Sequence, residues 1–357
     1  MLEHIEIEGV RNLSGVSLEI APGATLLFGA NGSGKTSFLE AIHLLGVGRS
    51  FRTHHSRPVI QHEAALCRVV GKVQRGSHRH TLGIERDRNG GVRAKIGGEP
   101  TQSLSELANH LPLILLDTDG LGILSGPPEG RRRLLDAILF HVEPAFLASW
   151  RRYQQALRQR NTGLRHGILG ADDAWLKELA ETGEKLTESR AQAATKLNES
   201  LLGLAPSLSE DLSDIVLSFR AGWDRKESLQ ASLERHRDSD RAQGFTQVGP
   251  HRADLRLASG GVSAAEVLSR GQLKLLMVAM RLAQGRMIEA ASHAEPLYLV
   301  DDLAAELDAR HCAAVCQALA GGRQVILTAV ERSALERAWG GDALRLFHVE
   351  QGSITAS

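Results

Sequence analysis

The stretch that most constrains the fold of this chain runs from residue 29 to residue 36, Gly-Ala-Asn-Gly-Ser-Gly-Lys-Thr. It fits the pattern G-x-x-x-x-G-K-[ST], whose glycines let the backbone wrap an anion with its N–H groups pointing inward. The lysine adds a positive charge at the β- and γ-phosphates, and the hydroxyl that follows is a ligand for Mg²⁺. We therefore expect a nucleoside triphosphate to be bound by Gly29, Ala30, Asn31, Gly32, Ser33, Gly34, Lys35, Thr36 and Ser37.

The residues on both sides of this phosphate loop support that interpretation. Residues 24–28 are mostly apolar and predict a buried strand, and residues 37–45 predict a helix that Gly46 stops. A strand, a loop and a helix in this order put the N-terminus of the helix, with its favourable dipole, under the phosphates. The sequence therefore predicts an α/β fold with a catalytic Lys35 and with Thr36 on the metal.

A second piece of phosphate chemistry ends the apolar segment 296–300, which is followed by Asp301 and Asp302. We expect this segment to form a strand directly beside strand 24–28. Asp301 could then reach Mg²⁺, directly or through water, and Asp302 could orient or polarise the attacking water. Both aspartates are therefore candidate catalytic residues, and Asp301 is a candidate metal ligand.

A third motif, Leu-Ser-Arg-Gly-Gln at 268–272, precedes an apolar helical segment. Ser269 can cap that helix, and Gly271 lets the backbone approach an anion closely. The motif is weak alone, because any capped helix could carry it. Followed within about 30 residues by the acid-ended strand, it becomes a specific nucleotide-binding signature, with Ser269, Gly271 and Gln272 as candidate ligands.

The composition limits which partners the chain can bind and in which cellular compartment it is expected. Lys plus Arg and Asp plus Glu both number 42, so the formal net charge is zero and a DNA-binding surface has to come from local clustering. Three cysteines suit a reducing compartment better than a disulfide framework. We expect a cytoplasmic protein, because the N-terminus lacks a signal-peptide core and no apolar run approaches about 20 residues.

The sequence alternates between segments that predict strands and segments that predict helices. Short strands between residues 62 and 96 predict a β-rich flap, and apolar residues at helical spacing follow residue 120. We expect a discontinuous first domain, 1–119 plus 241–357, and a helical arm inserted at 120–240.

The phosphate loop, the L-S-x-G-Q signature, the two aspartates and Glu306-Leu307-Asp308, in this order, resemble the ABC-type ATPase heads of the SMC class. Three further stretches resemble the RecF family of bacterial recombinational repair. They are Gly-Arg-Ser-Phe-Arg-Thr at 48–53, Gly-Pro-Pro-Glu-Gly-Arg-Arg-Arg-Leu-Leu-Asp at 126–136 and Gly-Pro-His-Arg-Ala-Asp at 249–254. The resemblance covers nearly the whole chain. It implies an ABC ATPase head with a β-rich flap and an inserted arm.

The resemblance also implies a function. Family members are weak DNA-dependent ATPases that bind ATP with Mg²⁺ and form an ATP-dependent homodimer, each signature completing the other subunit's site. They act at single-strand gaps and single-strand–duplex junctions with RecR and RecO, help to load RecA, and serve replication-fork maintenance, recombination and the SOS response to DNA damage. The matching arginine of SMC-like heads reaches the α- or β-phosphate, which suggests that role for Arg11; a surface salt bridge is the alternative.

Three positions depart from the related patterns. Val10 stands where the RecF family usually has phenylalanine, Thr328 stands where many ABC ATPases have a switch histidine, and Asp302 replaces a glutamate. A shorter acid without a switch histidine suggests slow hydrolysis.

Other readings stay open at this point. An ABC transporter subunit would share the three motifs, but it would carry the usual glutamate and histidine and a smaller insertion. A phosphate-loop kinase would lack the signature, and an ATP-gated scaffold without turnover would share everything. The arginines at 131–133 and 151–165 could contact DNA phosphates, or they could form a solvated helix face with salt bridges. Those at 131–133 could instead brace the arm against the head.

Overall fold

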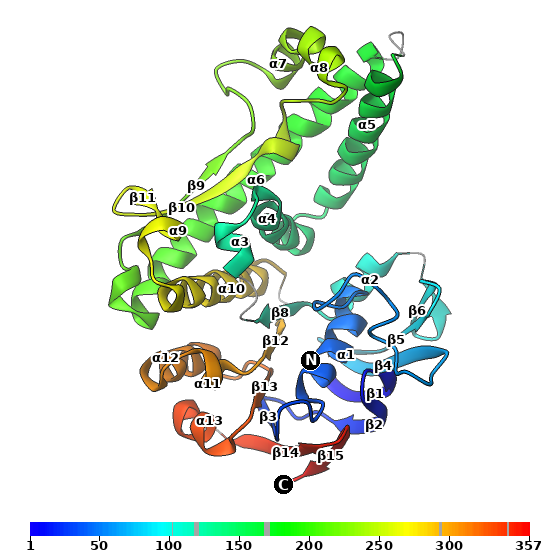
Figure 1. Cartoon of the computed structure of the whole chain (residues 1–357), viewed down its shortest axis with the longest axis vertical. Coiled ribbons are helices and arrows are strands. Elements are labelled where there is room, and N and C mark those ends of the chain that lie inside the picture. The colour runs from blue at the N-terminus through cyan, green and yellow to red at the C-terminus, as the bar shows by residue number, and fades with distance from the viewer. Residues whose placement is uncertain (102, 118–120, 168–171, 293–294, 341–342) are drawn as a thin grey trace. The chain divides into compact units, whose positions relative to one another are not determined.

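The computed structural model describes residues 1–357 apart from 102, 118–120, 168–171, 293–294 and 341–342. The chain forms two compact units, Met1–Asp119 with Ile288–Ser357, and Gly120–Met287 (Figure 1). Residues 241–287 pack within the second unit, whereas the sequence grouped them with the nucleotide-binding domain. That residues 241–287 belong to the ATPase head stays a prediction. The predicted boundary between residues 119 and 120 falls outside the described residues.

The first unit holds an antiparallel sheet whose strands alternate between buried apolar and exposed polar residues, as in β1, where Ile5 and Ile7 are buried. Its order is β2-β1-β4-β5-β6-β7. The strands are β1 (Leu2–Val10), β2 (Leu13–Glu19), β4 (Leu66–Arg75), β5 (His78–Asp87), β6 (Val92–Ile96) and β7 (Glu99–Pro100). The turn between β5 and β6 has Gly90 at φ 92°, as the Asn-Gly pair predicts. This sheet includes the predicted flap.

A second sheet in this unit has the order β15-β14-β3-β13-β12-β8, and β14, β3, β13, β12 and β8 are parallel neighbours. The strands are β3 (Ala24–Phe28), β8 (Leu113–Leu116), β12 (Leu297–Val300), β13 (Val325–Ala329), β14 (Leu344–Glu350) and β15 (Ser353–Ala356). The expectation that β12 lies directly beside β3 is wrong, because β13 separates them. Both strands still end at the same edge, so the residues that follow them meet there.

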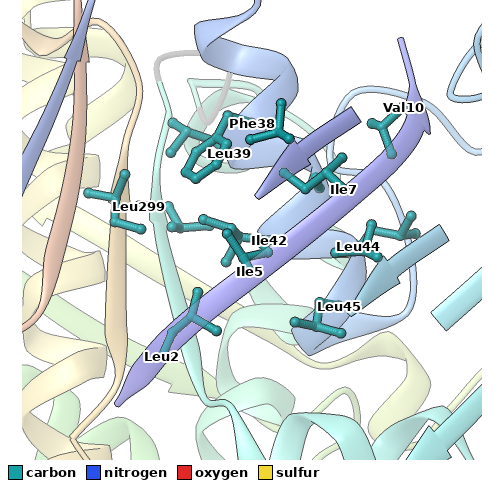
Figure 2. Close-up of a cluster of buried hydrophobic side chains, with 14 of the residues drawn as sticks. Leu2, Ile5, Ile7, Val10, Phe38, Leu39, Ile42, Leu44, Leu45 and Leu299 are labelled. Carbon is teal, nitrogen blue, oxygen red and sulfur yellow. The ribbon is translucent and has the colours of Figure 1, made fainter. Parts of the chain in front are cut away.

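Helix α1 (Lys35–Val47) packs against strands of both sheets of the first unit. Its apolar side chains join those of β1 and of β12 in one buried cluster, and Phe38, Ile42, Ile5 and Leu299 meet there (Figure 2). Burying such side chains contributes roughly 1.5–3 kcal/mol each. This core fixes the start of α1 against the sheet edge.

The predicted end of α1 at Gly46 is wrong, because the helix continues to Val47. Gly48, which has a left-handed φ of 77°, is its C-cap. Gly46 serves packing instead. A Cβ on Gly46 would lie 2.6 Å from Leu113 Cδ1 and 2.9 Å from the carbonyl oxygen of Leu111. The glycine therefore lets this turn of the helix approach the chain at β8.

The remaining helices of the first unit are short. They are α2 (Leu104–His110), α11 (Leu303–Glu306), α12 (Ala309–Leu319) and α13 (Arg332–Trp339). Helix α12 begins after Asp308, whose carboxylate accepts a hydrogen bond from the His311 backbone N–H at 3.0 Å. Asp308 is thereby already used as a helix cap.

The second unit combines helices with a three-stranded antiparallel sheet of order β11-β10-β9, and its long helix α6 packs against α5 and β9 (Figure 1). Its elements are α3 (Leu121–Ser125), α4 (Pro128–Val142), α5 (Phe146–His166), α6 (Asp172–Leu208), β9 (Ile215–Arg220), α7 (Leu229–Arg235), α8 (Arg237–Gln243), β10 (Asp254–Ser259), β11 (Val262–Ser263), α9 (Ala264–Val267) and the start of α10 (Arg270–Ser292). Two short 3₁₀ turns lie at Glu210–Leu212 and Pro250–Arg252.

Candidate nucleotide-binding site

The phosphate loop connects the end of β3 to the start of α1, as the sequence predicts. Gly29, Gly32 and Gly34 have φ values of 154°, 78° and 125°, where a side chain is strained. A Cβ on Gly29 would also lie 2.2 Å from the carbonyl oxygen of Val349 in β14. The glycines therefore allow both the curvature of the loop and its close approach to the neighbouring strand.

Lys35 is the first residue of α1, and only 6% of its surface is exposed. Its Nζ donates to the carbonyl oxygens of Gly29 at 2.8 Å and Ala30 at 3.0 Å. Burial lowers the pKa of Lys35, and the nearby carboxylates of Asp302 and Asp301 oppose that shift. The ammonium group is thus held inside the loop, where phosphate oxygens can replace its carbonyl partners.

Asp301 follows β12 and reaches the start of α1. Its Oδ1 accepts hydrogen bonds from the hydroxyl of Thr36 at 3.0 Å and from the hydroxyl of Thr328 at 2.7 Å. The structure therefore brings together the hydroxyl and the carboxylate that the sequence assigned to one metal ion.

These two groups suit Mg²⁺. Hydroxyl and carboxylate oxygens are hard ligands, and neighbouring oxygens of an octahedral Mg²⁺ at about 2.1 Å lie about 3 Å apart, like Thr36 Oγ1 and Asp301 Oδ1. No group of three or more His, Cys, Asp or Glu side chains among the described residues could hold a metal ion. Mg²⁺ commonly takes one or two protein oxygens and completes its shell with phosphates and water, which fits this donor set.

Asp302 follows directly and has a left-handed backbone, φ 46° and ψ 43°. Its backbone N–H donates to Thr328 Oγ1 at 2.9 Å. Burial raises the pKa of the Asp302 carboxyl, Lys35 opposes the rise, and Asp301 and Glu306 add to it. The site thus holds two adjacent acids in different environments, and the second binds a proton more readily than a free aspartate.

Arg11 does not contact the loop in this structure. It forms a bidentate pair with Glu40 of α1, with Nε–Oε2 and Nη2–Oε1 distances of 2.8 Å. Glu40 is fully buried and also accepts from Ser50, so this is a buried pair and not the surface salt bridge that was the alternative. Binding of a phosphate by Arg11 stays a prediction.

Two groups that hold the phosphate loop escaped the sequence analysis. Asn12 donates to the carbonyl oxygens of Gly32 at 3.2 Å and Ser33 at 3.1 Å, and accepts from Ser37 Oγ at 2.9 Å. The Gly352 N–H, in the turn between β14 and β15, donates to Ser33 O at 2.8 Å. The only sequence signal for a role of Asn12 was its place in the Arg-Asn pair after the first strand.

The signature lies in the second unit and forms a capping box at the start of α10. Gln272 N donates to Ser269 Oγ at 3.3 Å, and Ser269 N donates to Gln272 Oε1 at 2.8 Å. Gln272 Nε2 also donates to Asp211 at 2.9 Å. Gly271 is exposed, and a Cβ there would meet nothing within 4 Å. Nothing described in this chain requires a glycine at 271.

Two of the arginines considered for DNA are buried in ion pairs of the second unit. Arg131 binds Asp254 bidentately at 2.9 and 3.2 Å and donates to three backbone carbonyls. Arg160, 1% exposed, donates to Asp240 at 2.7 Å and to Thr246 at 2.8 Å. Both arginines therefore brace the unit.

The segment Gly249–Asp254, which carries part of the family resemblance, is a hub of the same unit. The Tyr153 hydroxyl lies 2.7 Å from His251 Nδ1, and Arg190 donates to Pro250 O at 2.7 Å. Arg132 donates to Ala253 O at 2.7 Å. Tyr153 is 2% exposed and packs in the core of the unit. This segment ties α4, α5 and α6 together.

Among the described residues, each helix is too short or too polar to cross a membrane.

Known proteins match this chain along its full length. A profile of the RecF/RecN/SMC N-terminal domain matches residues 1–355. The DNA replication and repair protein RecF of Stutzerimonas stutzeri (strain A1501) is 45% identical over 359 residues, covering 99% of this chain and 97% of that protein. The protein of the same name from Pseudomonas syringae pv. tomato is 44% identical, with 99% and 98% covered.

Solved structures show the same fold. One is the structure of the recombination mediator protein RecF with ATP in the RecFOR pathway, which matches with a TM-score of 0.88 at 23% identity and covers 100% of this chain and 97% of that chain. An Smc head bound to the C-terminal winged-helix domain of ScpA matches with a TM-score of 0.57 at 16% identity, with 100% and 96% covered. The predicted fold of an ATPase head with a helical insertion is thereby confirmed, and the chain belongs to the RecF family of the RecF/RecN/SMC group.

Proposed function

We propose that this chain is a cytoplasmic, ATP-dependent DNA-binding protein of recombinational repair and replication-fork maintenance. The observation that carries the proposal is the 3.0 Å contact between Thr36 of the phosphate loop and Asp301 at the end of β12. It brings the phosphate loop and a candidate metal-binding acid together in a chain whose relatives, at 45% and 44% identity, are named DNA replication and repair protein RecF.

At this site, different residues of the chain would each perform one part of ATP hydrolysis. The loop N–H groups and Lys35 bind the β- and γ-phosphates, and Thr36 and Asp301 would hold Mg²⁺, which neutralises charge that develops on the phosphates. Asp302, next along the chain, polarises the attacking water and accepts its proton. A short acid, with Thr328 in place of a switch histidine, favours slow turnover, which suits a timer.

The signature suggests that one chain supplies only part of each site. Ser269 and the Gly271–Gln272 backbone lie at an exposed helix N-terminus, where a phosphate is favoured. Two chains related by a two-fold axis would each offer this surface to the γ-phosphate held by the other. ATP would then hold the dimer together, and hydrolysis would release it.

The DNA-related part of the proposal rests on the family. We propose binding at single-strand gaps and single-strand–duplex junctions, with RecR and RecO as partners in loading RecA and with a role in the SOS response. Arg158 and Arg165 on α5 are exposed and stay candidates for phosphate contact. Arg131 and Arg160 are not, because their guanidinium groups are already bound inside the unit.

Sedimentation tests the dimer. ATP with Mg²⁺ is expected to give a dimer and ADP a monomer, and Ser269→Arg should abolish the dimer while leaving ATP binding intact, since the phosphate loop is untouched. A sedimentation coefficient that does not depend on the nucleotide would contradict the proposal.

Two assays test the DNA part. ATP turnover should rise when gapped DNA is added, and gel shifts with single-strand, duplex and junction DNA should be stronger with ATP than with ADP. ATP-dependent dimerisation without turnover on any DNA would instead support an ATP-gated scaffold.

A further inference from the structure

Thr328 connects the two aspartates of the site. It lies in β13, between the strand that leads to the phosphate loop and the strand that leads to the acids, and it is 0% exposed. Its hydroxyl donates to Asp301 Oδ1 at 2.7 Å and accepts from the backbone N–H of Asp302 at 2.9 Å. One side chain thus uses both its donor and its acceptor on two consecutive residues.

The two contacts act on different features of the acids. The bond to Oδ1 fixes the orientation of the Asp301 carboxylate, on the same oxygen that Thr36 binds. The bond from the peptide N–H stabilises the left-handed backbone of Asp302, which costs an aspartate energy and determines where its side chain is directed. Without the hydroxyl, a partly buried N–H and a carboxylate oxygen would each lose a partner.

We propose that Thr328 is a positioning residue for ATP hydrolysis, a role that rests on the proposed function. It acts through the acids: it keeps Asp301 aimed at the metal position and holds Asp302 in its left-handed geometry. In the sequence patterns, Thr328 stands where many ABC ATPases have a switch histidine. The threonine hydroxyl faces Asp301, so it contributes by orienting the residues that act.

The strand next to β13 offers a matched control. Thr25 in β3 is opposite Ile326 in the register, is equally buried, and its hydroxyl has no hydrogen-bond partner among the described residues. Thr25→Val therefore removes a buried hydroxyl from the same sheet without touching the acids. Thr328→Val removes the hydroxyl of interest at nearly constant shape, and Thr328→Ser restores it.

The experiment measures kcat and KM for ATP, and the Mg²⁺ dependence of equilibrium binding of a fluorescent N-methylanthraniloyl ATP. Thr328→Val should lower kcat about 10- to 100-fold and raise the Mg²⁺ concentration for half-maximal binding by a similar factor, since outer partners of metal ligands have effects of this size. KM for ATP at saturating Mg²⁺ should change little. Thr328→Ser should recover most of both losses, and Thr25→Val should equal the parent.

Several results would overturn the proposal. Parent values of kcat and Mg²⁺ dependence in Thr328→Val would do so, and so would an equal loss in Thr328→Ser, because the hydroxyl would then not matter. If Thr328→Val does not fold, Thr328→Cys replaces it, since a thiol is a poor donor and acceptor, and parent behaviour in that variant refutes the role. If the parent hydrolyses no ATP with any DNA, the proposed hydrolysis fails, while the Mg²⁺ dependence of nucleotide binding still decides the role of Thr328.

Discussion

The Thr36 hydroxyl donates a 3.0 Å hydrogen bond to Asp301 Oδ1, although 265 positions separate the two residues in the sequence. Thr36 is fixed by the start of α1, which packs in the apolar core, and Asp301 is fixed by the end of β12, which is buried in the parallel sheet. The contact therefore depends on the sheet order rather than on either motif. It sets where a metal and a triphosphate can sit.

Replacing Asp302 with Asn should trap the ATP-bound state. The amide cannot accept the proton of the attacking water, so turnover should fall at least about 100-fold while nucleotide binding persists. The parent rate should rise with pH as Asp302 ionises. This rise should disappear from the residual activity of Asp302→Asn.

Steady-state rates across pH, together with sedimentation in ATP and Mg²⁺, check this prediction. Asp302→Glu is the control, since it keeps a carboxylate and should keep a pH-dependent rate. Unchanged turnover in Asp302→Asn would show that another group activates the water.

Replacing Ser269 with Asp separates capping from phosphate binding. Aspartate is as good an N-cap as serine, so α10 should keep its first turn and the melting temperature should change little. The added charge should repel a γ-phosphate offered by a second subunit, and ATP-dependent dimerisation should be lost. Differential scanning fluorimetry and sedimentation measure the two effects separately, and a dimer that survives the added charge would place the phosphate elsewhere.

Arg158 and Arg160 are two positions apart on α5 but should behave oppositely. Arg160→Met leaves the fully buried Asp240 without its partner and should destabilise the protein by about 3–5 kcal/mol. Arg158 is exposed, so Arg158→Ala should cost little stability. If α5 contacts DNA, Arg158→Ala should weaken binding and reduce its salt dependence.

Chemical unfolding of both arginine variants, followed by filter binding of Arg158→Ala at several salt concentrations, checks the pair. Equal stabilities for the two variants would contradict the buried ion pair. An unchanged salt dependence would remove Arg158 from the DNA surface.

His251 should make the protein sensitive to mild acid. The pKa of His251 is lowered to about 4, mainly by burial and also by the positive charges of Arg252, Arg132 and Arg190, whereas the hydrogen bond to Thr246 opposes the shift. Between pH 6.5 and 4 the unfolded chain takes up a proton that the folded chain refuses, so stability is full above this window and is lost as pH falls through it. The loss amounts to about 3 kcal/mol.

Denaturant unfolding of the parent and of His251→Gln at several pH values checks this. The glutamine variant should be less stable at neutral pH, because its contact with Tyr153 changes, and should lose about 3 kcal/mol less on acidification. The exposed His54→Gln variant should follow the parent curve. Parallel curves for the parent and His251→Gln would assign the acid sensitivity to other groups.

The sequence was sufficient to predict the local structures that rest on short patterns. The glycine spacing predicted the loop, and the apolar run before Asp301 predicted a buried strand, because backbone angles and burial leave local traces. The order of the strands in the sheet leaves no local pattern in the sequence, so the placement of β13 between β3 and β12 was not predicted. Sheet order is decided by crossovers and packing between distant segments.

The same limit applies to single side chains. Glu40 is the one acid in the apolar start of α1, and only the structure connects it to Arg11 and Ser50. Gly46 satisfied the pattern of a helix stop, yet close packing at β8 was the stronger demand. Arg131 and Arg160 belong to a basic surface by composition, and burial removed them from it.

The strand order also bears on biosynthesis. Strand β3 pairs with β13 on one side and β14 on the other, and both follow the second unit in the chain. A nascent chain therefore carries the loop strand with two open edges until the second unit, β13 and β14 have been synthesised, and such edges invite aggregation. Premature termination before Leu344 would remove β14, and with it the Val349 backbone that lies against Gly29 of the phosphate loop.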